Sequence, residues 1–100
     1  MNKFAMYGKL TALPGKRDEL VGILLEAADI LQSNANCDLY IVNVSDDYPD
    51  TVWVTELWKD QEAHAASLAD TKVLELLQRG RPLIAGGEPL QLRPVGGKGL

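Results

Sequence analysis

Five side chains between positions 43 and 64 have types suited to chemistry on a small ligand. They are Asn43, Trp53, Glu56, Trp58 and His64. An amide donates a hydrogen bond to a ligand oxygen that gains negative charge, and a carboxylate or an imidazole exchanges a proton. An indole ring stacks on a flat aromatic ligand. Because His64 is the only histidine of the chain, it is the candidate general base.

Each of these residues also has an ordinary structural interpretation. A lone histidine more often packs or forms a structural hydrogen bond than it catalyses, and tryptophans more often belong to a core or an interface. Asn43 interrupts an apolar segment, so it either bonds a neighbouring backbone group or lies near the strand end, or else donates a hydrogen bond to a ligand oxygen. Glu56 either pairs with a basic side chain or lies in solvent, because a buried unpaired carboxylate is costly.

The sequence holds no motif for a metal ion, a nucleotide or a covalent nucleophile. The single cysteine, Cys37, cannot form an internal disulfide, and one cysteine with one histidine cannot make a Cys2His2-type zinc site. The aspartates at 46, 47 and 50 lack the spacing of a calcium loop, and no helix follows the glycines at 96, 97 and 99 as it would follow a phosphate loop. We therefore expect no cofactor, and no bound metal, flavin or haem.

Composition and charge narrow the classes of protein further. We expect residues 1–100 to form one domain, with an irregular tail at 95–100. The chain has 10 Lys and Arg against 14 Asp and Glu, and its net charge of -4 argues against binding to nucleic acid or to an anionic membrane. No apolar run approaches the roughly 20 residues of a membrane helix, and the opening residues do not resemble a signal peptide. These features predict a cytoplasmic protein.

The spacing of apolar residues predicts four strands and two helical regions. The second helical region consists of two pieces, with Asp60 as the N-cap of the first and Asp70 as a cap or break between them. We expect strands at 3–12, 37–45, 51–58 and 90–93, and helices at 16–32, 61–68 and 71–79. The order βαββαβ predicts an α+β, ferredoxin-like fold with one four-stranded antiparallel sheet and helices on one face.

Both faces of the middle strands are apolar. Leu39 and Ile41 point to one face, and Tyr40 and Val42 point to the other. The helices can cover only one face, so the second face needs a cover that one copy of the chain does not supply. A twofold homodimer is the common solution, and the alternative is a curled sheet that leaves a few apolar groups exposed. The aromatic residues Tyr40 and Trp53 favour the homodimer.

The expected site lies between the sheet and the second helical region. His64 shares a helix face with Ser67 and Leu68, and we expect Leu68 to face the core. Asn43 and Trp53 lie on adjacent strands over which that helix packs, so we expect them to converge with His64 on one cavity. A single bulge would turn either of them to the opposite face. The expected substrate-binding residues are Trp58, Glu56, Ser67 and Leu68.

Three blocks of the sequence, taken in order, resemble a known family. The blocks are Leu13-Pro14-Gly15-Lys16-Arg17-Asp18-Glu19-Leu20, Tyr40-Ile41-Val42-Asn43, and Trp53-Val54-Thr55-Glu56-Leu57-Trp58 followed by Glu62-Ala63-His64. Together they resemble the antibiotic biosynthesis monooxygenase (ABM) domain. Each block is short, so the resemblance lies in their order, and it extends from about Tyr7 to Leu92.

The resemblance implies a dimeric ferredoxin-like α/β barrel and an oxidoreductase. Characterised enzymes of the family include cofactor-independent oxygenases of phenolic polyketides or hydroquinones, and others degrade haem. It thus implies a monooxygenase that oxidises a small electron-rich aromatic, a quinol or polyketide-like phenol, with dioxygen. In that scheme Asn43 donates a hydrogen bond, Trp53 stacks on the substrate and His64 accepts the proton. The implied partners are the substrate, dioxygen and a second copy of the chain, without nucleic acid or membrane.

Two departures from the family pattern affect the expected activity. Many members carry a histidine where this chain has Ser67, one turn after His64. The haem-degrading branch uses an asparagine where this chain has Gly8, a tryptophan at Ser67 and a histidine near 73–77, where this chain has none. These differences argue against haem degradation. The alternative to an oxygenase is a non-catalytic dimeric module for binding or assembly around a small hydrophobic metabolite.

Overall fold

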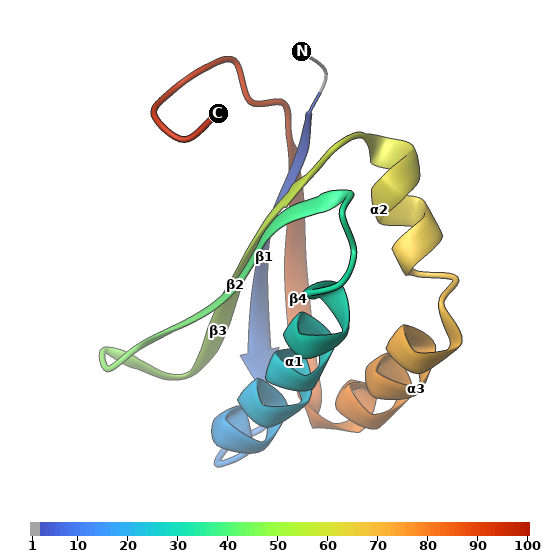
Figure 1. Cartoon of the computed structure of the whole chain (residues 1–100). Helices are drawn as coiled ribbons and strands as arrows, with labels where there is room; N and C mark the ends of the chain where they lie inside the picture. The colour runs from blue at the N-terminus through green and yellow to red at the C-terminus, as the bar shows by residue number, and fades with distance from the viewer. Residues whose placement is uncertain (1–2) are drawn as a thin grey trace.

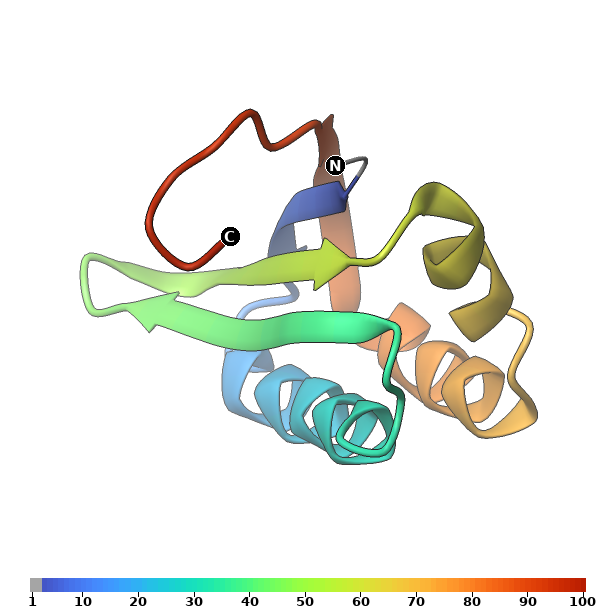
Figure 2. The ribbon, with the colours of Figure 1, turned by 45° about the horizontal axis from the view of Figure 1, so that its top comes forward.

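Within residues 3–100, the part of the chain that the computed structural model describes, a four-stranded antiparallel sheet carries three α-helices on one face (Figure 1; Figure 2). The first two residues of the expected domain lie outside the described part. The strands, in the sheet order β2-β3-β1-β4, are β1 (Phe4–Ala12), β2 (Cys37–Ser45), β3 (Tyr48–Trp58) and β4 (Ile84–Leu92). The helices are α1 (Arg17–Leu31), α2 (Gln61–Ser67), α3 (Thr71–Gly80) and the 3₁₀ turn η1 (Arg81–Leu83). The predicted ferredoxin-like α+β fold is confirmed.

The hydrophobic core lies between the sheet and the helices. Leu20 and Leu24 recur at helical spacing on α1, and both are buried against Val52 and Val54 of β3. The register pairs Leu10 of β1 with Val52, so alternate residues of the two central strands face the helices. No helix in this described part is long and apolar enough to cross a membrane.

Two aspartates begin the helices after β3, as the sequence predicts. The carboxylate of Asp60 accepts a hydrogen bond from the backbone N–H of Ala63 at 2.8 Å and so caps α2. The carboxylate of Asp70 accepts hydrogen bonds from Lys72 N at 2.8 Å and Val73 N at 3.2 Å and so caps α3. Each cap satisfies N–H groups that have no partner inside the helix.

The third strand begins earlier than the sequence pattern predicts. We expected a turn through Pro49 and a strand from Thr51, but β3 begins at Tyr48. Its pairing with β1 extends only to Thr51, opposite Thr11, so Pro49 lies on a part of the hairpin that projects beyond β1. Proline is tolerated there because no strand on that side needs the missing N–H.

The fourth strand is also longer than expected. We expected it from Leu90, but it begins at Ile84. Gly87 and Pro89 conceal the strand pattern, yet β4 is an edge strand that pairs only with β1, and an edge strand accommodates proline. A Cβ on Gly87 would lie 3.4 Å from Cδ2 of Leu10, so this glycine permits close packing against β1.

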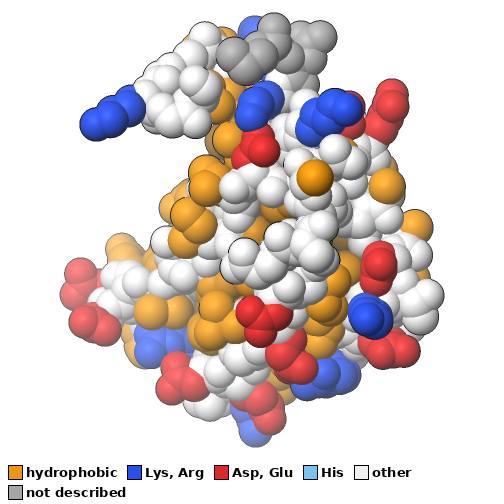
Figure 3. All heavy atoms as spheres, viewed as in Figure 1, with side chains coloured by type: hydrophobic (Ala, Val, Ile, Leu, Met, Phe, Trp, Pro, Cys, Tyr) orange, Lys and Arg blue, Asp and Glu red, His pale blue; other side chains and the backbone are white. Residues whose placement is uncertain are grey.

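The sheet face opposite the helices is apolar, as the sequence predicts. Its exposed large hydrophobic residues are Tyr7, Leu39, Ile41, Leu90 and Leu92. We call this set the outer apolar face. Figure 1 shows that the C-terminal tail also curls on this side of the sheet, and Figure 3 shows apolar side chains at the surface between the tail and the β2–β3 turn.

Candidate active site

The structure places the predicted site residues on opposite faces of the sheet. Asn43 is paired with Trp53, and Tyr40 is paired with Glu56. Successive side chains of a strand point to opposite faces, so Trp53 shares its face with Thr55 and Glu56 points to the other face. Glu56 faces the helices and His64, whereas Asn43 and Trp53 face away. The prediction that Asn43, Trp53 and His64 converge on one cavity is therefore wrong.

Asn43 and Trp53 instead connect the two strands of the β2–β3 hairpin. The side-chain Nδ2 of Asn43 donates hydrogen bonds to the backbone oxygen of Trp53 at 3.0 Å and to Oγ1 of Thr55 at 3.1 Å. The ring of Trp53 meets the ring of Tyr48 edge-on, with 5.8 Å between centroids. Of the two interpretations of Asn43, the geometry favours the structural one.

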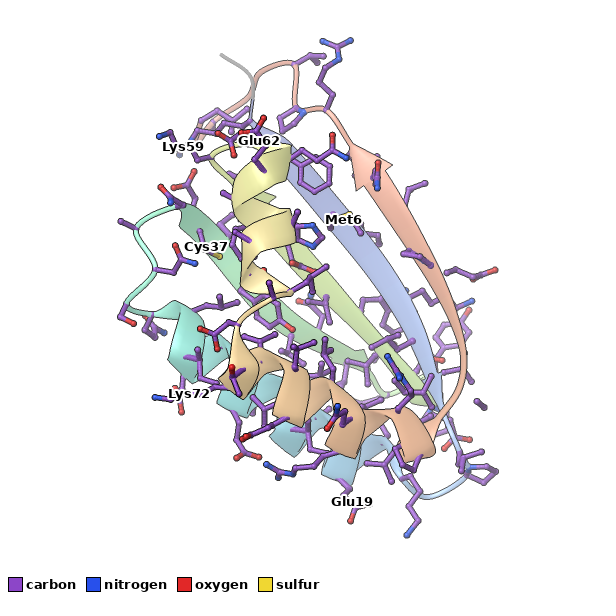
Figure 4. The ribbon with its side chains drawn as sticks, turned by 90° about the vertical axis from the view of Figure 1, so that its right-hand side faces the viewer. Met6, Glu19, Cys37, Lys59, Glu62 and Lys72 are labelled. Carbon is purple, nitrogen blue, oxygen red and sulfur yellow. The ribbon has the colours of Figure 1, made fainter. Side chains whose placement is uncertain are left out.

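An apolar cavity of about 190 Å³ lies between the sheet and the helices. Its wall includes five residues that the sequence analysis selected: Glu56, Trp58, His64, Ser67 and Leu68. Most of the remaining wall is aliphatic, so the cavity suits an apolar or aromatic ligand. Figure 4 views α2 and α3 in front of the sheet, with Met6 marking the part of β1 that pairs with Glu56.

Glu56, Trp58 and His64 form a polar cluster within this cavity. The indole Nε1 of Trp58 donates a hydrogen bond to Oε1 of Glu56 at 3.0 Å. Nε2 of His64 lies 3.8 Å from the same oxygen, and each of the two side chains is 16% exposed. The imidazole also packs against the rings of Phe4 and Trp58, at centroid distances of 5.2 and 5.4 Å. The cluster brings a carboxylate and an imidazole together in an apolar cavity.

Residues 4–79 match the family model described as Antibiotic biosynthesis monooxygenase. The chain belongs to the ABM family. The resemblance of the sequence blocks is thereby confirmed. No curated protein sequence matches the chain closely enough to count as a relative.

Solved structures agree with the ABM assignment. A candidate antibiotic biosynthesis monooxygenase from Chloroflexus aurantiacus J-10-fl is 41% identical, with 97% of each chain covered and a TM-score of 0.87. A Caulobacter crescentus CB15 candidate of the same description is 20% identical, with 95% of this chain and 92% of that chain covered and a TM-score of 0.88. A mutant of SnoaB, a cofactor-independent oxygenase from Streptomyces nogalater, is 14% identical over 100% of both chains, with a TM-score of 0.86. The last two likenesses concern the fold alone.

Burial shifts the protonation of two acidic groups in the wall of the apolar cavity, Glu56 and Tyr40. Burial raises the pKa of Glu56 above its ordinary value, and the hydrogen bond from Trp58 and the nearby His64 partly offset the rise. Burial, followed by the charge of Glu56, also raises the pKa of Tyr40 and keeps its phenol neutral. A carboxylate with a raised pKa is a stronger base than one in water. Glu56 is therefore suited to accept a proton from a ligand.

The short helix α2 positions His64. The hydroxyl of Ser67 donates a hydrogen bond to the backbone oxygen of His64 at 2.6 Å, so Ser67 is engaged within the helix. Leu68 follows α2 and is 43% exposed at the edge of the cavity. As the C-cap of α2, Leu68 keeps helical backbone and lines the cavity on the His64 side as expected, but it lies at the edge of the cavity rather than buried in the core.

Tyr40 is a cavity residue that the sequence analysis did not select. It lies opposite Glu56 in the register and lines the same cavity. The alternation of β2 carried the signal, since Tyr40 shares its face with Val42. The interpretation of Glu56 as paired with a basic side chain or exposed missed its hydrogen bond to Trp58.

A second hollow on the surface does not include the polar cluster. This groove of about 640 Å³ lies beside the cavity, with Leu31, Ser67 and Val73 contributing to both. Its lining contains neither Glu56 nor His64. Among residues 3–100, no three His, Cys, Asp or Glu side chains are grouped as a metal site.

Proposed function

We propose that this ABM protein oxidises a small electron-rich aromatic, a hydroquinone or a related phenol, with dioxygen and without a cofactor. The observation that carries the proposal is the pairing of Glu56 and His64 inside an apolar cavity. Such a site removes a proton from a phenol and keeps the resulting phenolate away from water. ABM membership supports the reaction class.

The proposed reaction balances without another reductant. The Glu56–His64 pair accepts the phenolic proton, and the electron-rich ring then forms a carbon–oxygen bond with dioxygen. Cleavage of the oxygen–oxygen bond leaves one oxygen atom on the ring and releases the other as water. Hydroquinone plus dioxygen gives hydroxyquinone plus water, so the substrate supplies all four electrons.

In this proposal, Glu56 and Trp58 take over roles first expected of residues on the other face. Trp58 forms part of the cavity wall and is positioned to contact an aromatic ring, as Trp53 was expected to do. Its N–H also holds Glu56 in place. His64 keeps its expected role as proton acceptor, now shared with the carboxylate 3.8 Å away.

Oxygen uptake with a panel of small hydroquinones and anthrones tests the proposal. We expect Glu56→Gln and His64→Asn each to lower turnover by roughly 100-fold or more, because each removes a proton-accepting group. Glu62→Gln makes the same chemical change on an exposed position of α2 and should retain activity. Transfer of ¹⁸O from dioxygen to the product would support oxygenation, whereas release of hydrogen peroxide with an unlabelled quinone would contradict it.

The second candidate function is non-catalytic binding of a small hydrophobic metabolite. One observation favours it: Asn43, the expected donor to a charged intermediate, makes its hydrogen bonds within the hairpin instead. Anaerobic binding of aromatic ligands without oxygen uptake in air would favour this function over the oxygenase. Equal oxygen uptake by the wild type and by both cavity variants would also exclude the proposed proton transfer.

A further inference from the structure

The size of the cavity limits the part of a ligand that it encloses. Its volume is about 190 Å³, and an apolar protein cavity of roughly 150 Å³ holds benzene. One six-membered ring with its hydroxyl groups therefore occupies most of the available space. Any larger substituent on that ring must leave the cavity.

Two leucines mark the place where the cavity opens. Among the described residues of its wall, only Leu68 and Leu77 are exposed, at 43% and 40%. Leu68 directly follows α2, and Leu77 lies in the second half of α3, so the opening lies between the end of α2 and this part of α3. The remaining wall residues are buried or half-buried.

The chemistry of this opening selects for apolar groups. Both exposed residues are aliphatic, and Glu56 is the acidic residue of the wall. A carboxylate or phosphate leaving the cavity here would meet no lysine or arginine in the wall and would lie near the Glu56 carboxylate. An alkyl group would instead remove leucine surface from water, which is favourable.

We propose that the ligand is a single aromatic ring with an alkyl substituent, and that Leu68 and Leu77 select this substituent at the opening of the cavity. The assignment of the ring as a hydroquinone or phenol rests on the proposed function. The selection of an alkyl substituent rests on the volume of the cavity and on its two exposed wall residues. Leu68 and Leu77 are thus specificity-determining residues.

Leu74 provides a matched control for Leu77. It lies on the same helix and is 41% exposed, but it does not line the cavity. Replacing either leucine by alanine removes the same atoms from a similarly exposed position. A difference between the two variants in ligand selection therefore reports contact with the ligand rather than a general effect on α3.

The test is calorimetric titration under argon, where binding is measured without oxidation. The probes are hydroquinone, methylhydroquinone, propylhydroquinone, pentylhydroquinone and a hydroquinone that carries a carboxylate. In the wild type we expect affinity to rise about twofold to fourfold for each methylene, as for a CH₂ group that leaves water. Leu77→Ala should flatten this rise, Leu77→Met should largely restore it, and Leu74→Ala should keep it. The carboxylate probe should bind no better than hydroquinone.

Several outcomes would overturn the inference. In the wild type, these are an affinity that does not change with alkyl length, tighter binding of the carboxylate probe than of hydroquinone, and no binding of hydroquinone at all. In the variants, it is the same change of affinity with alkyl length for Leu77→Ala and Leu74→Ala. Oxygen uptake is measured separately in air. Binding that depends on alkyl length without oxygen uptake would contradict the proposed oxygenase and support alkyl selection. Oxygen uptake with affinity independent of alkyl length would support the oxygenase and contradict alkyl selection.

Discussion

The carboxylate of Glu56 experiences opposing influences. Burial disfavours its charge, whereas the N–H of Trp58 and the nearby imidazole of His64 favour it. The net effect is a raised pKa. A group in this balance costs stability when it is ionised, and in return it provides a base inside an apolar cavity.

The raised pKa of Glu56 predicts a pH-dependent stability difference between the wild type and Glu56→Gln. The folded protein binds this proton more tightly than the unfolded chain. Glu56 therefore contributes most to the free energy of unfolding at pH values below its ordinary pKa of 4.5. That contribution is lost as pH rises through the raised pKa. We therefore expect Glu56→Gln to gain stability relative to the wild type between pH 4.5 and neutral pH, measured by urea unfolding. A relative gain by the wild type over this range would contradict the assignment, and Glu62→Gln is the control.

Asn43 should matter for stability more than for turnover. Asn43→Ala removes the hydrogen bonds to the Trp53 backbone and to Thr55, and we expect it to lower the free energy of unfolding by about 1–2 kcal/mol. Turnover should remain near that of the wild type, because Asn43 lies on the face opposite the cavity. The control is Asn36→Ala, at an exposed position before β2. Normal stability with a 100-fold to 1,000-fold loss of turnover would return Asn43 to the active site.

Residue types pointed to the chemistry, but alternation decided which residues share a site. Trp58 and Glu56 were selected from the sequence, and the structure brings them together with His64. Asn43 and Trp53 were selected for equally sound chemical reasons and lie on the other face. Strict counting along β3 separates Trp53 from Glu56, and only the sheet register then shows that Asn43 lies beside Trp53.

At the scale of elements, α2 is the part of the fold on which the site most depends. It has only seven residues, too few to be stable as an isolated helix. Its position is set by the Asp60 cap and by the contacts of His64 with Phe4 and Trp58. Figure 2 shows α2 over one end of the sheet, apart from α1.

The two helix caps should therefore differ in their effects on activity. Asp60→Ala and Asp70→Ala each remove a capping carboxylate, and each should cost about 1 kcal/mol of unfolding free energy. Asp60→Ala should also lower turnover, because it loosens the helix that carries His64. Asp70→Ala is the matched control on α3, and the two variants are compared by urea unfolding and steady-state kinetics. Equal turnover in both would show that α2 does not need its cap to position His64.

The sequence predicted the order of elements because each element has a clear local signal. Apolar spacing defined α1, and Asp60 and Asp70 defined the starts of the later helices. The boundaries of β3 and β4 were wrong because Pro49 and Pro89 indicate turns locally. Only the pairing of whole strands shows that Pro49 lies where β3 extends beyond β1, and that Pro89 lies on the edge strand β4.

At the scale of the whole molecule, the sheet has one covered face and one exposed apolar face. The helices cover the first, and the outer apolar face retains Tyr7, Ile41 and Leu90 at the surface. Monomeric proteins seldom expose a large contiguous patch of this kind. A second copy of the chain is the partner expected from the sequence.

We predict a homodimer that buries the outer apolar face. Ile41→Asp should convert the dimer to a monomer. Ile41 is 45% exposed in the single chain, and the change would bury a charge at this position in the dimer. Leu25→Asp, at a 50% exposed position of α1, is the control that should remain dimeric. Light scattering at micromolar concentration distinguishes the states, and we expect a buried area above roughly 1,000 Å². A monomeric wild type would contradict the prediction.

His64 packs between Phe4 and Trp58 while its Nε2 approaches Glu56. The side chain proposed to accept the proton thus also packs α2 against the sheet. When α2 unfolds locally, the imidazole leaves the cavity while the four strands keep their pairing. Amide hydrogens of α2 should then exchange with solvent in the same opening event that removes His64 from the proposed site. We therefore expect the proposed activity to be lost on heating at the temperature where α2 opens, before the sheet unfolds.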